Sequence, residues 1–263
     1  MQKNNSESKS RFDQVLDQAS VETPTLPLIH NCDGYVFRSI LESQKIKAFQ
    51  CDTFVNDSLI YFYYGRPAYR VSKDKNSTSL KSSYPVCIVM SPPANLNPKR
   101  MFPLDSGAFA ANMFSDFFHQ DIEIENLSLK PEIESAGKIV SYFFGSNSNY
   151  LKSEPKNIKV NPLDFEIQSY EELISANSKT NYDDRRATIE LQYDQSIALS
   201  ESNVRLIIMP NCFRDDPLVL KKIELWGCEC ETYYTFHWKA DEYTSIIYDK
   251  LFSYFSKNGL LVC

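Results

Sequence analysis

The stretch DSLIYFYYGRPAYR, residues 57–70, holds five aromatic side chains together with a glycine, a proline and two arginines. Its first half is typical of a β-strand, because aromatic and β-branched residues fit the pleated surface of a sheet. Proline lacks the N–H that a central strand donates, so Gly65-Arg66-Pro67 predicts that the chain leaves the sheet at this point. The tyrosine hydroxyls favour a strand that lines a partly wet pocket.

The composition is that of a globular protein with a hydrophobic core. Of the 263 residues, 43% are hydrophobic and 24% are charged, which suits one large domain or two small ones. Only seven residues are glycine, and neither G-x-x-x-x-G-K-[ST] nor G-x-G-x-x-G occurs, which argues against a P-loop enzyme and a dinucleotide-binding Rossmann domain. The net charge of −6 provides no general attraction to nucleic-acid phosphates.

Cysteine usage and the apolar runs bear on the compartment. The seven cysteines are odd in number and contain no C-x-x-C pair, which indicates free thiols in a reducing compartment rather than disulfides or a zinc site. The N-terminal MQKNNSESKSRFDQ lacks the apolar segment of a signal peptide, and the run VRLIIMP at 204–210 is far too short to span a bilayer. We therefore expect a cytoplasmic, soluble protein with no membrane partner and no bound metal.

Patterns along the chain predict one mixed α+β domain over residues 24–263, preceded by a flexible or weakly helical lead-in over 1–23. Short apolar runs predict strands at 26–30, 58–65, 84–91, 187–194 and 204–210, with one or two more within 218–238. Amphipathic runs predict helices at 33–44, 106–118 and 240–259. In ATIELQYD, 187–194, polar and apolar residues alternate, so Thr188, Glu190 and Gln192 share one face.

Two of these segments carry a family resemblance. LIHNCDGYVFRSILESQKI, 28–46, followed by LIYFYYGRPAYR, 59–70, resembles the first half of the ADP-ribosyltransferase fold, as found in poly(ADP-ribose) polymerases and in DNA-modifying bacterial toxins. In that family a first strand ends in a histidine, a second carries a tyrosine and a late strand carries a glutamate. His30, Tyr61 and Glu190 match these positions in order. The resemblance implies split mixed sheets with flanking helices.

The resemblance also implies an activity, the transfer of ADP-ribose from NAD. Cleavage of the bond between nicotinamide and ribose develops positive charge on the sugar, which a carboxylate can stabilise, while tyrosine rings can stack on nicotinamide and histidine can orient the ribose. Glu190 is then the expected catalytic residue. The residues expected to bind NAD are His30, Tyr61, Tyr64, Arg66 and Tyr69.

The acceptor of the ADP-ribose is left open as DNA, RNA or protein, and a toxin or a defence effector would fit. A NAD glycohydrolase and a non-catalytic binding or assembly module with the same fold remain alternatives, and the oligomeric state is open. Two other candidate sites are weaker. Ser106 in LDSGAF lacks the G-x-S-x-G context of a hydrolase nucleophile, and Glu171-Glu172 lies in a helix-like stretch with no buried strand after it.

Overall fold

Most of the expected strands come together in one mixed sheet of a computed structural model, which describes residues 9–68, 80–176, 184–236 and 240–261. The order across the sheet is β10-β9-β5-β1-β4-β7-β6, and β3 pairs with β4 outside this path. Only the pair of β9 and β10 is parallel among the pairs described. The strands of this sheet are β1 (Leu28–Asp33), β3 (Phe49–Gln50), β4 (Ser58–Tyr64), β5 (Pro85–Met90), β6 (Arg100–Phe102), β7 (Glu190–Tyr193), β9 (Val204–Pro210) and β10 (Glu229–Tyr233).

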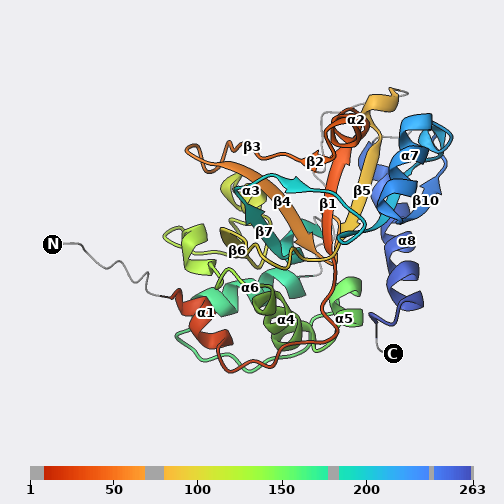
Figure 1. Cartoon of the computed structure of the whole chain (residues 1–263). Coiled ribbons are helices and arrows are strands. Elements are labelled where there is room, and N and C mark those ends of the chain that lie inside the picture. The colour runs from red at the N-terminus through yellow and green to blue at the C-terminus, as the bar shows by residue number, and fades with distance from the viewer. Residues whose placement is uncertain (1–8, 69–79, 177–183, 237–239, 262–263) are drawn as a thin grey trace.

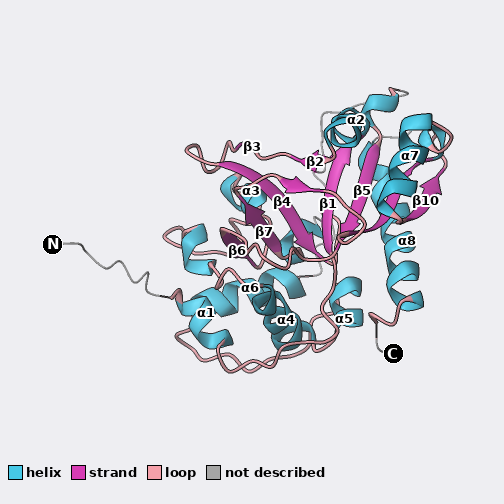
Figure 2. Ribbon diagram, viewed as in Figure 1, coloured by secondary structure: helices cyan, strands magenta, loops and turns pink. Residues whose placement is uncertain are grey.

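Helices flank this sheet, as Figure 2 shows. In Figure 1, α1, α4, α5 and α6 gather at one end of the strands, α2 lies at the other end, and α7 and α8 lie beside β10. A separate two-stranded ribbon joins β2 (Lys45–Ile46) to β8 (Ile197–Ala198). The helices are α1 (Arg11–Leu16), α2 (Gly34–Ser43), α3 (Ser106–Ala110), α4 (Ile133–Ile139), α5 (Asn147–Lys152), α6 (Phe165–Ser175), α7 (Pro217–Trp226) and α8 (Thr244–Lys257). The fold is therefore a mixed sheet with flanking helices, which agrees with the expected α+β class.

Strands β1 and β4 lie side by side for a short distance only. Leu28 pairs with Tyr64 and Ile29 with Tyr63, whereas all six residues of β1 pair with β5. The two strands therefore separate beyond Ile29, and the sheet opens between them toward the end of β1. Strands β1 and β4 are the two strands that carry His30 and Tyr61, so the opening lies between these two residues' strands.

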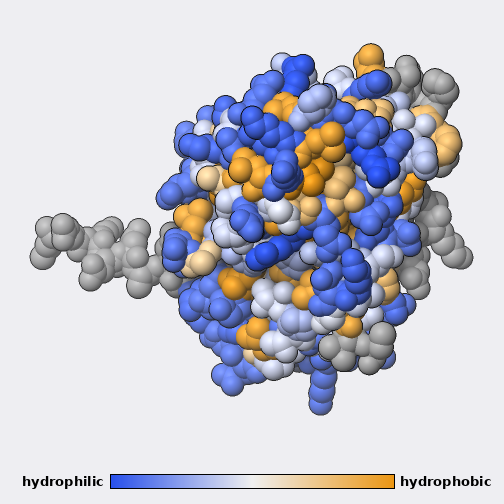
Figure 3. All heavy atoms as spheres, turned by 45° about the vertical axis from the view of Figure 1, so that its right-hand side comes forward, coloured by the Kyte–Doolittle hydropathy of each residue, from blue (hydrophilic) through white to orange (hydrophobic). Residues whose placement is uncertain are grey.

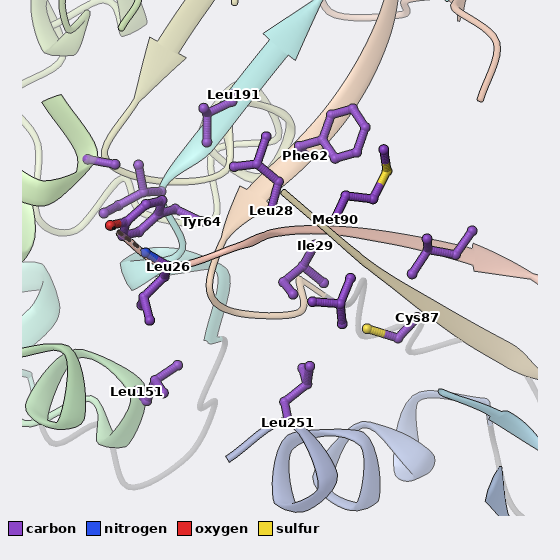
Figure 4. Close-up of a cluster of buried hydrophobic side chains, with 14 of the residues drawn as sticks. Leu26, Leu28, Ile29, Phe62, Tyr64, Cys87, Met90, Leu151, Leu191 and Leu251 are labelled. Carbon is purple, nitrogen blue, oxygen red and sulfur yellow. Dashed lines mark hydrogen bonds between the residues drawn. The ribbon is translucent and has the colours of Figure 1, made fainter. Parts of the chain in front are cut away.

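Both faces of the sheet are covered, because side chains alternate along each strand. Figure 4 shows Leu28, Phe62 and Leu191 on one side of the sheet, and Ile29 and Cys87 on the other side, toward Leu251 of α8. These five strand residues are fully buried. The strand expected at 187–194 forms β7 and is likewise buried on both faces, since Glu190 and Gln192 are at most 1% exposed.

The lead-in expected over residues 1–23 has to be shortened, because part of it belongs to the folded domain. Ser10 caps α1 by accepting a hydrogen bond from the backbone N–H of Asp13. Phe12 and Leu16 of α1 are fully buried, and the Phe12 ring packs on Phe143 and Tyr170. Residues 1–8 lie outside the described residues.

Capping residues place two of the helices. Asp33 accepts a hydrogen bond from Val36 N and begins α2, as expected. The apolar run after residue 217 is different: it forms α7 rather than a strand, because Asp216 caps its N-terminus, Pro217 occupies the first turn and Gly227 ends it. Among the described residues of the expected 218–238 segment, only β10, which follows Gly227, is a strand.

Gly65 forms the turn by which the chain leaves β4. Its φ of +64° is in the left-handed region, and a Cβ atom here would lie 2.5 Å from Leu26 Cδ1. We expect Gly65→Ala to lower the free energy of unfolding by about 2–4 kcal/mol, from backbone strain plus overpacking. Gly259 is the matched control, because it has a φ of +67° and open space around its Cα.

Urea denaturation of both variants separates these two contributions. Gly259→Ala should cost only the backbone strain, about 1 kcal/mol. Equal losses in the two variants would show that the contact with Leu26 contributes nothing and that the turn adjusts to a larger side chain.

The surface is mostly hydrophilic, with one patch of hydrophobic atoms in the upper half of the face shown in Figure 3. Among the helices in the described part of the chain, none combines the length and the apolar character needed to cross a membrane.

Candidate functional site

Strands β4 and β7 bring the predicted tyrosine and glutamate together. Tyr63 pairs directly with Glu190, and Tyr61 pairs directly with Gln192. Residues that pair across antiparallel strands project from the same face of the sheet. Four polar side chains therefore form a block on one face of two neighbouring strands.

The carboxyl group of Glu190 is buried and held by three hydrogen-bond donors. Its side chain is 1% exposed. Ser106 Oγ donates to Oε1 at 2.7 Å, Ser106 N donates to Oε2 at 3.2 Å, and Gln192 Nε2 donates to Oε1 at 2.7 Å. The orientation of the carboxyl group is thus fixed from the start of α3 and from its own strand.

A second acid, Asp105, lies beside this group. Asp105 is 6% exposed and caps α3 by accepting a hydrogen bond from Ala108 N at 2.6 Å. Its other oxygen accepts a hydrogen bond from the Tyr63 hydroxyl at 3.3 Å. Within the described residues, neither Asp105 nor Glu190 forms an ion pair. The block therefore contains two buried carboxyl groups without a cation of their own.

Burial has a clear electrostatic consequence for Glu190. Removal from water raises its pKa to about 8, and the charge of Asp105 adds to the rise. The hydrogen bonds from Ser106 and Gln192 act in the opposite direction but do not cancel it. At neutral pH Glu190 is therefore mainly protonated, which suits a general acid or base more than a structural anion.

Tyr61 keeps its proton next to the acids. Its hydroxyl lies 2.7 Å from Cys51 Sγ, which also accepts a hydrogen bond from Phe54 N. Burial raises the pKa of Tyr61, and the contact with Cys51 and the charge of Glu190 raise it further. Tyr61 can thus provide a neutral hydroxyl and a ring face, and not an anion.

His30 lies on the neighbouring strand β1, but its imidazole lies on the face of the sheet opposite Glu190. Ile29 is the partner of Tyr63, so the alternation along β1 directs His30 to the face that carries Phe62. The two rings are 5.5 Å apart, and His30 Nδ1 donates to the Tyr61 carbonyl at 3.1 Å. Burial lowers the pKa of His30, so Nδ1 carries the proton and Nε2 can accept.

Arg66 lies away from the acids, in a buried network at the end of β4. It is 1% exposed and donates hydrogen bonds to the Tyr248 hydroxyl, the Tyr150 carbonyl, Ser153 Oγ and Asp184. Its guanidinium also lies over the rings of Tyr150 and Tyr248. The structure therefore gives Arg66 protein partners in place of the expected nucleotide.

Tyr64, which was also expected to bind NAD, is not part of this site. Tyr64 is 1% exposed, and its hydroxyl accepts a hydrogen bond from Leu26 N at 3.0 Å (Figure 4). It is a core residue on the face away from Glu190. Tyr69 lies outside the described residues.

Of the six predicted site residues, the structure brings Tyr61 and Glu190 together and places His30 on the adjacent strand. It adds three residues that the sequence argument did not assign to the site, namely Asp105, Ser106 and Gln192. A signal was present for Asp105-Ser106, because an aspartate before a short helical run is a typical N-cap. Nothing local in the sequence placed that cap against β7. Within the described residues, no group of three His, Cys, Asp or Glu side chains is arranged to hold a metal ion.

Comparisons with known proteins leave the family open. No protein-family model matches the chain, and no curated protein matches it in sequence. The functional assignment therefore depends on the geometry around Glu190 and on the residues that carry the resemblance.

Proposed function

We propose that this protein is an ADP-ribosyltransferase that uses NAD as its substrate, with Glu190 as the catalytic residue and a nucleic acid or a protein as the acceptor. One observation supports it most: the strands that carry His30, Tyr61 and Glu190 are neighbours in the sheet, in the order β1-β4-β7. A long interval separates Glu190 from the other two residues in the sequence. Their adjacency is therefore a result of the fold.

The chemistry of the site suits cleavage of an N-glycosidic bond. As nicotinamide departs, positive charge develops on the ribose, and a fixed carboxylate stabilises it. A unit charge pair about 4 Å apart, at an effective dielectric constant of about 20, contributes about 4 kcal/mol, which is close to a thousandfold in rate. The three donors to Glu190 hold its carboxyl group in one orientation before the substrate arrives.

The side chains around Glu190 take separate roles in this proposal. Tyr61 provides a hydroxyl and a ring face, which can hold the nicotinamide or the ribose. His30 acts through its hydrogen bond to the Tyr61 carbonyl, which ties β1 to β4 where the two strands separate. Because the His30 ring lies on the face away from Glu190, its role in this proposal is to position Tyr61 and not to contact the ribose.

The test uses NAD labelled in its adenylate phosphate, incubated with the protein and with separate pools of DNA, RNA and protein. We expect one pool to become labelled with the wild type, and no pool with Glu190→Gln. Glu171→Gln, in the partly exposed part of α6, is the matched control and should label as the wild type does. Release of nicotinamide without a labelled pool would assign a glycohydrolase, and no consumption of NAD would contradict both activities.

A further inference from the structure

Two buried carboxyl groups, Asp105 and Glu190, share neighbours on both sides. Ser106 follows Asp105 in the chain and donates both its N–H and its hydroxyl to Glu190. Tyr63 lies opposite Glu190 in the sheet and donates its hydroxyl to Asp105. The two acids are therefore connected through one residue of α3 and one residue of β4.

The surroundings provide no cation for this pair within the described residues. Arg100 of β6 is the nearest through hydrogen bonds, because its Nη1 donates to Gln192 Oε1 at 3.4 Å. Its Nη2 is already paired with Asp57 at 2.6 Å. Arg185 is the other nearby cation. Its carbonyl accepts a hydrogen bond from Asp105 N, but its side-chain Nη2 donates to Met113 Sδ. The other groups beside the pair are the hydroxyls of Tyr61 and Tyr63 and the thiol of Cys51, which lies 2.7 Å from the Tyr61 hydroxyl.

Two adjacent buried acids without a cation cannot both be ionised cheaply, so one proton stays with the pair. We propose that Asp105 is a positioning residue that keeps the Glu190 carboxyl group protonated in the free protein, and that the pair releases this proton to solvent when the positively charged nicotinamide ring of NAD enters. The release of the proton on NAD binding rests on the proposed function. The ring then replaces the proton as the positive partner of Glu190, which becomes the carboxylate that the reaction needs.

The order of the causes of the Glu190 pKa shift agrees with this assignment. Burial is the largest cause, and the charge of Asp105 is the next. Asparagine at position 105 would remove the charge and keep the cap of α3, because asparagine caps helices as well as aspartate does. Asp105→Asn thus separates the electrostatic role of this residue from its structural one.

The first experiment needs no NAD. Protein labelled with ¹³C at the glutamate side-chain carboxyl is titrated by NMR, and the Glu190 signal is assigned by its loss in Glu190→Gln. We expect a wild-type midpoint well above the ordinary glutamate range, a midpoint at least one pH unit lower in Asp105→Asn, and a retained high midpoint in Asp105→Glu. Asp164→Asn is the control, since Asp164 pairs with Arg11 and has no described contact with either acid, and it should leave the midpoint unchanged.

Equal midpoints in the wild type and Asp105→Asn would overturn the role of Asp105. Should Asp105→Asn fail to fold, the wild-type titration decides by itself: an ordinary Glu190 midpoint overturns the proposal, and a Glu190 midpoint well above the ordinary glutamate range supports it.

The second experiment measures the proton. Calorimetric titrations with NAD at pH 7.5 are run in phosphate and in Tris, which differ in their heats of ionisation. The difference between the two heats should correspond to about one released proton per bound NAD with the wild type, and to none with Glu190→Gln. If NAD binds without release of a proton, the proposal that the nicotinamide ring replaces the proton on Glu190 is overturned. Absence of binding overturns the proposed function and the exchange together, while the NMR titration still decides the role of Asp105.

Discussion

Replacing Glu190 by glutamine should reduce ADP-ribosyl transfer by about a thousandfold or more and, at the same time, stabilise the fold above neutral pH. The loss of rate follows from the loss of the carboxyl group that lies directly opposite Tyr63 in the sheet. The gain in stability follows because glutamine needs no proton to be neutral in a buried site. A catalytic residue that lowers stability is a frequent compromise at active sites.

The sign of the pH dependence is fixed by the direction of the pKa shift. The pKa of Glu190 is about 8 in the folded protein against an ordinary 4.5, so between these values the folded state binds more protons than the unfolded state. The free energy of unfolding of the wild type therefore falls as the pH rises through this window, by up to about 1.4 kcal/mol per pH unit. Glu190→Gln lacks this loss.

Urea denaturation at pH 5 and at pH 8 measures this difference. We expect the two proteins to have similar stability at pH 5 and the variant to be more stable by about 2–4 kcal/mol at pH 8. Glu171→Gln keeps Glu190, so it should lose stability between pH 5 and pH 8 as the wild type does. A variant that is inactive and equally stable at both pH values would keep Glu190 as a catalytic residue but would contradict its protonation at neutral pH.

Local patterns predicted the longer central strands well, because each of them is a short apolar run, but they missed the short strands β2, β3, β6 and β8. The runs at 84–91 and 204–210 became β5 and β9 with little change. The segment 218–238 was expected to hold one or two strands and holds one, β10; its first half is a helix, since leucine, valine and isoleucine fit a buried strand and a helix alike. The helix is decided by Asp216, Pro217 and Gly227 at its ends, which the apolar pattern does not weigh.

The site could be predicted only in part. Alternation in ATIELQYD placed Glu190 and Gln192 on one face, and that face turned out to be buried because α3 covers it. Ser106 lies 84 residues before Glu190 in the chain. The contact between them is set by tertiary structure, so no local signal shows it. His30 shows the same limit, since the face that it takes depends on the register between β1 and β4.

Arg66 was expected to bind a nucleotide and instead lies in a buried hydrogen-bond network. Replacing it by alanine should lower the free energy of unfolding by about 3–5 kcal/mol. A buried arginine is stable only with its partners in place. Its removal takes one hydrogen-bond donor from the Tyr150 carbonyl and the paired charge from Asp184. Because Tyr248 belongs to α8 and Tyr150 to α5, the loss also separates two helices from the end of β4.

A double-mutant cycle of Arg66→Met and Asp184→Asn distinguishes a structural ion pair from a nucleotide ligand. If Arg66 mainly stabilises the fold, each single variant is strongly destabilised and the double variant loses less than the sum, since no unpaired charge remains. If Arg66 instead binds the NAD pyrophosphate, as its place after β4 first suggested, Arg66→Met costs little stability and weakens NAD binding in calorimetry. The guanidinium has its four hydrogen bonds within the protein. A nucleotide could therefore reach it only by displacing Asp184 or Tyr248, and for that reason we expect the first outcome.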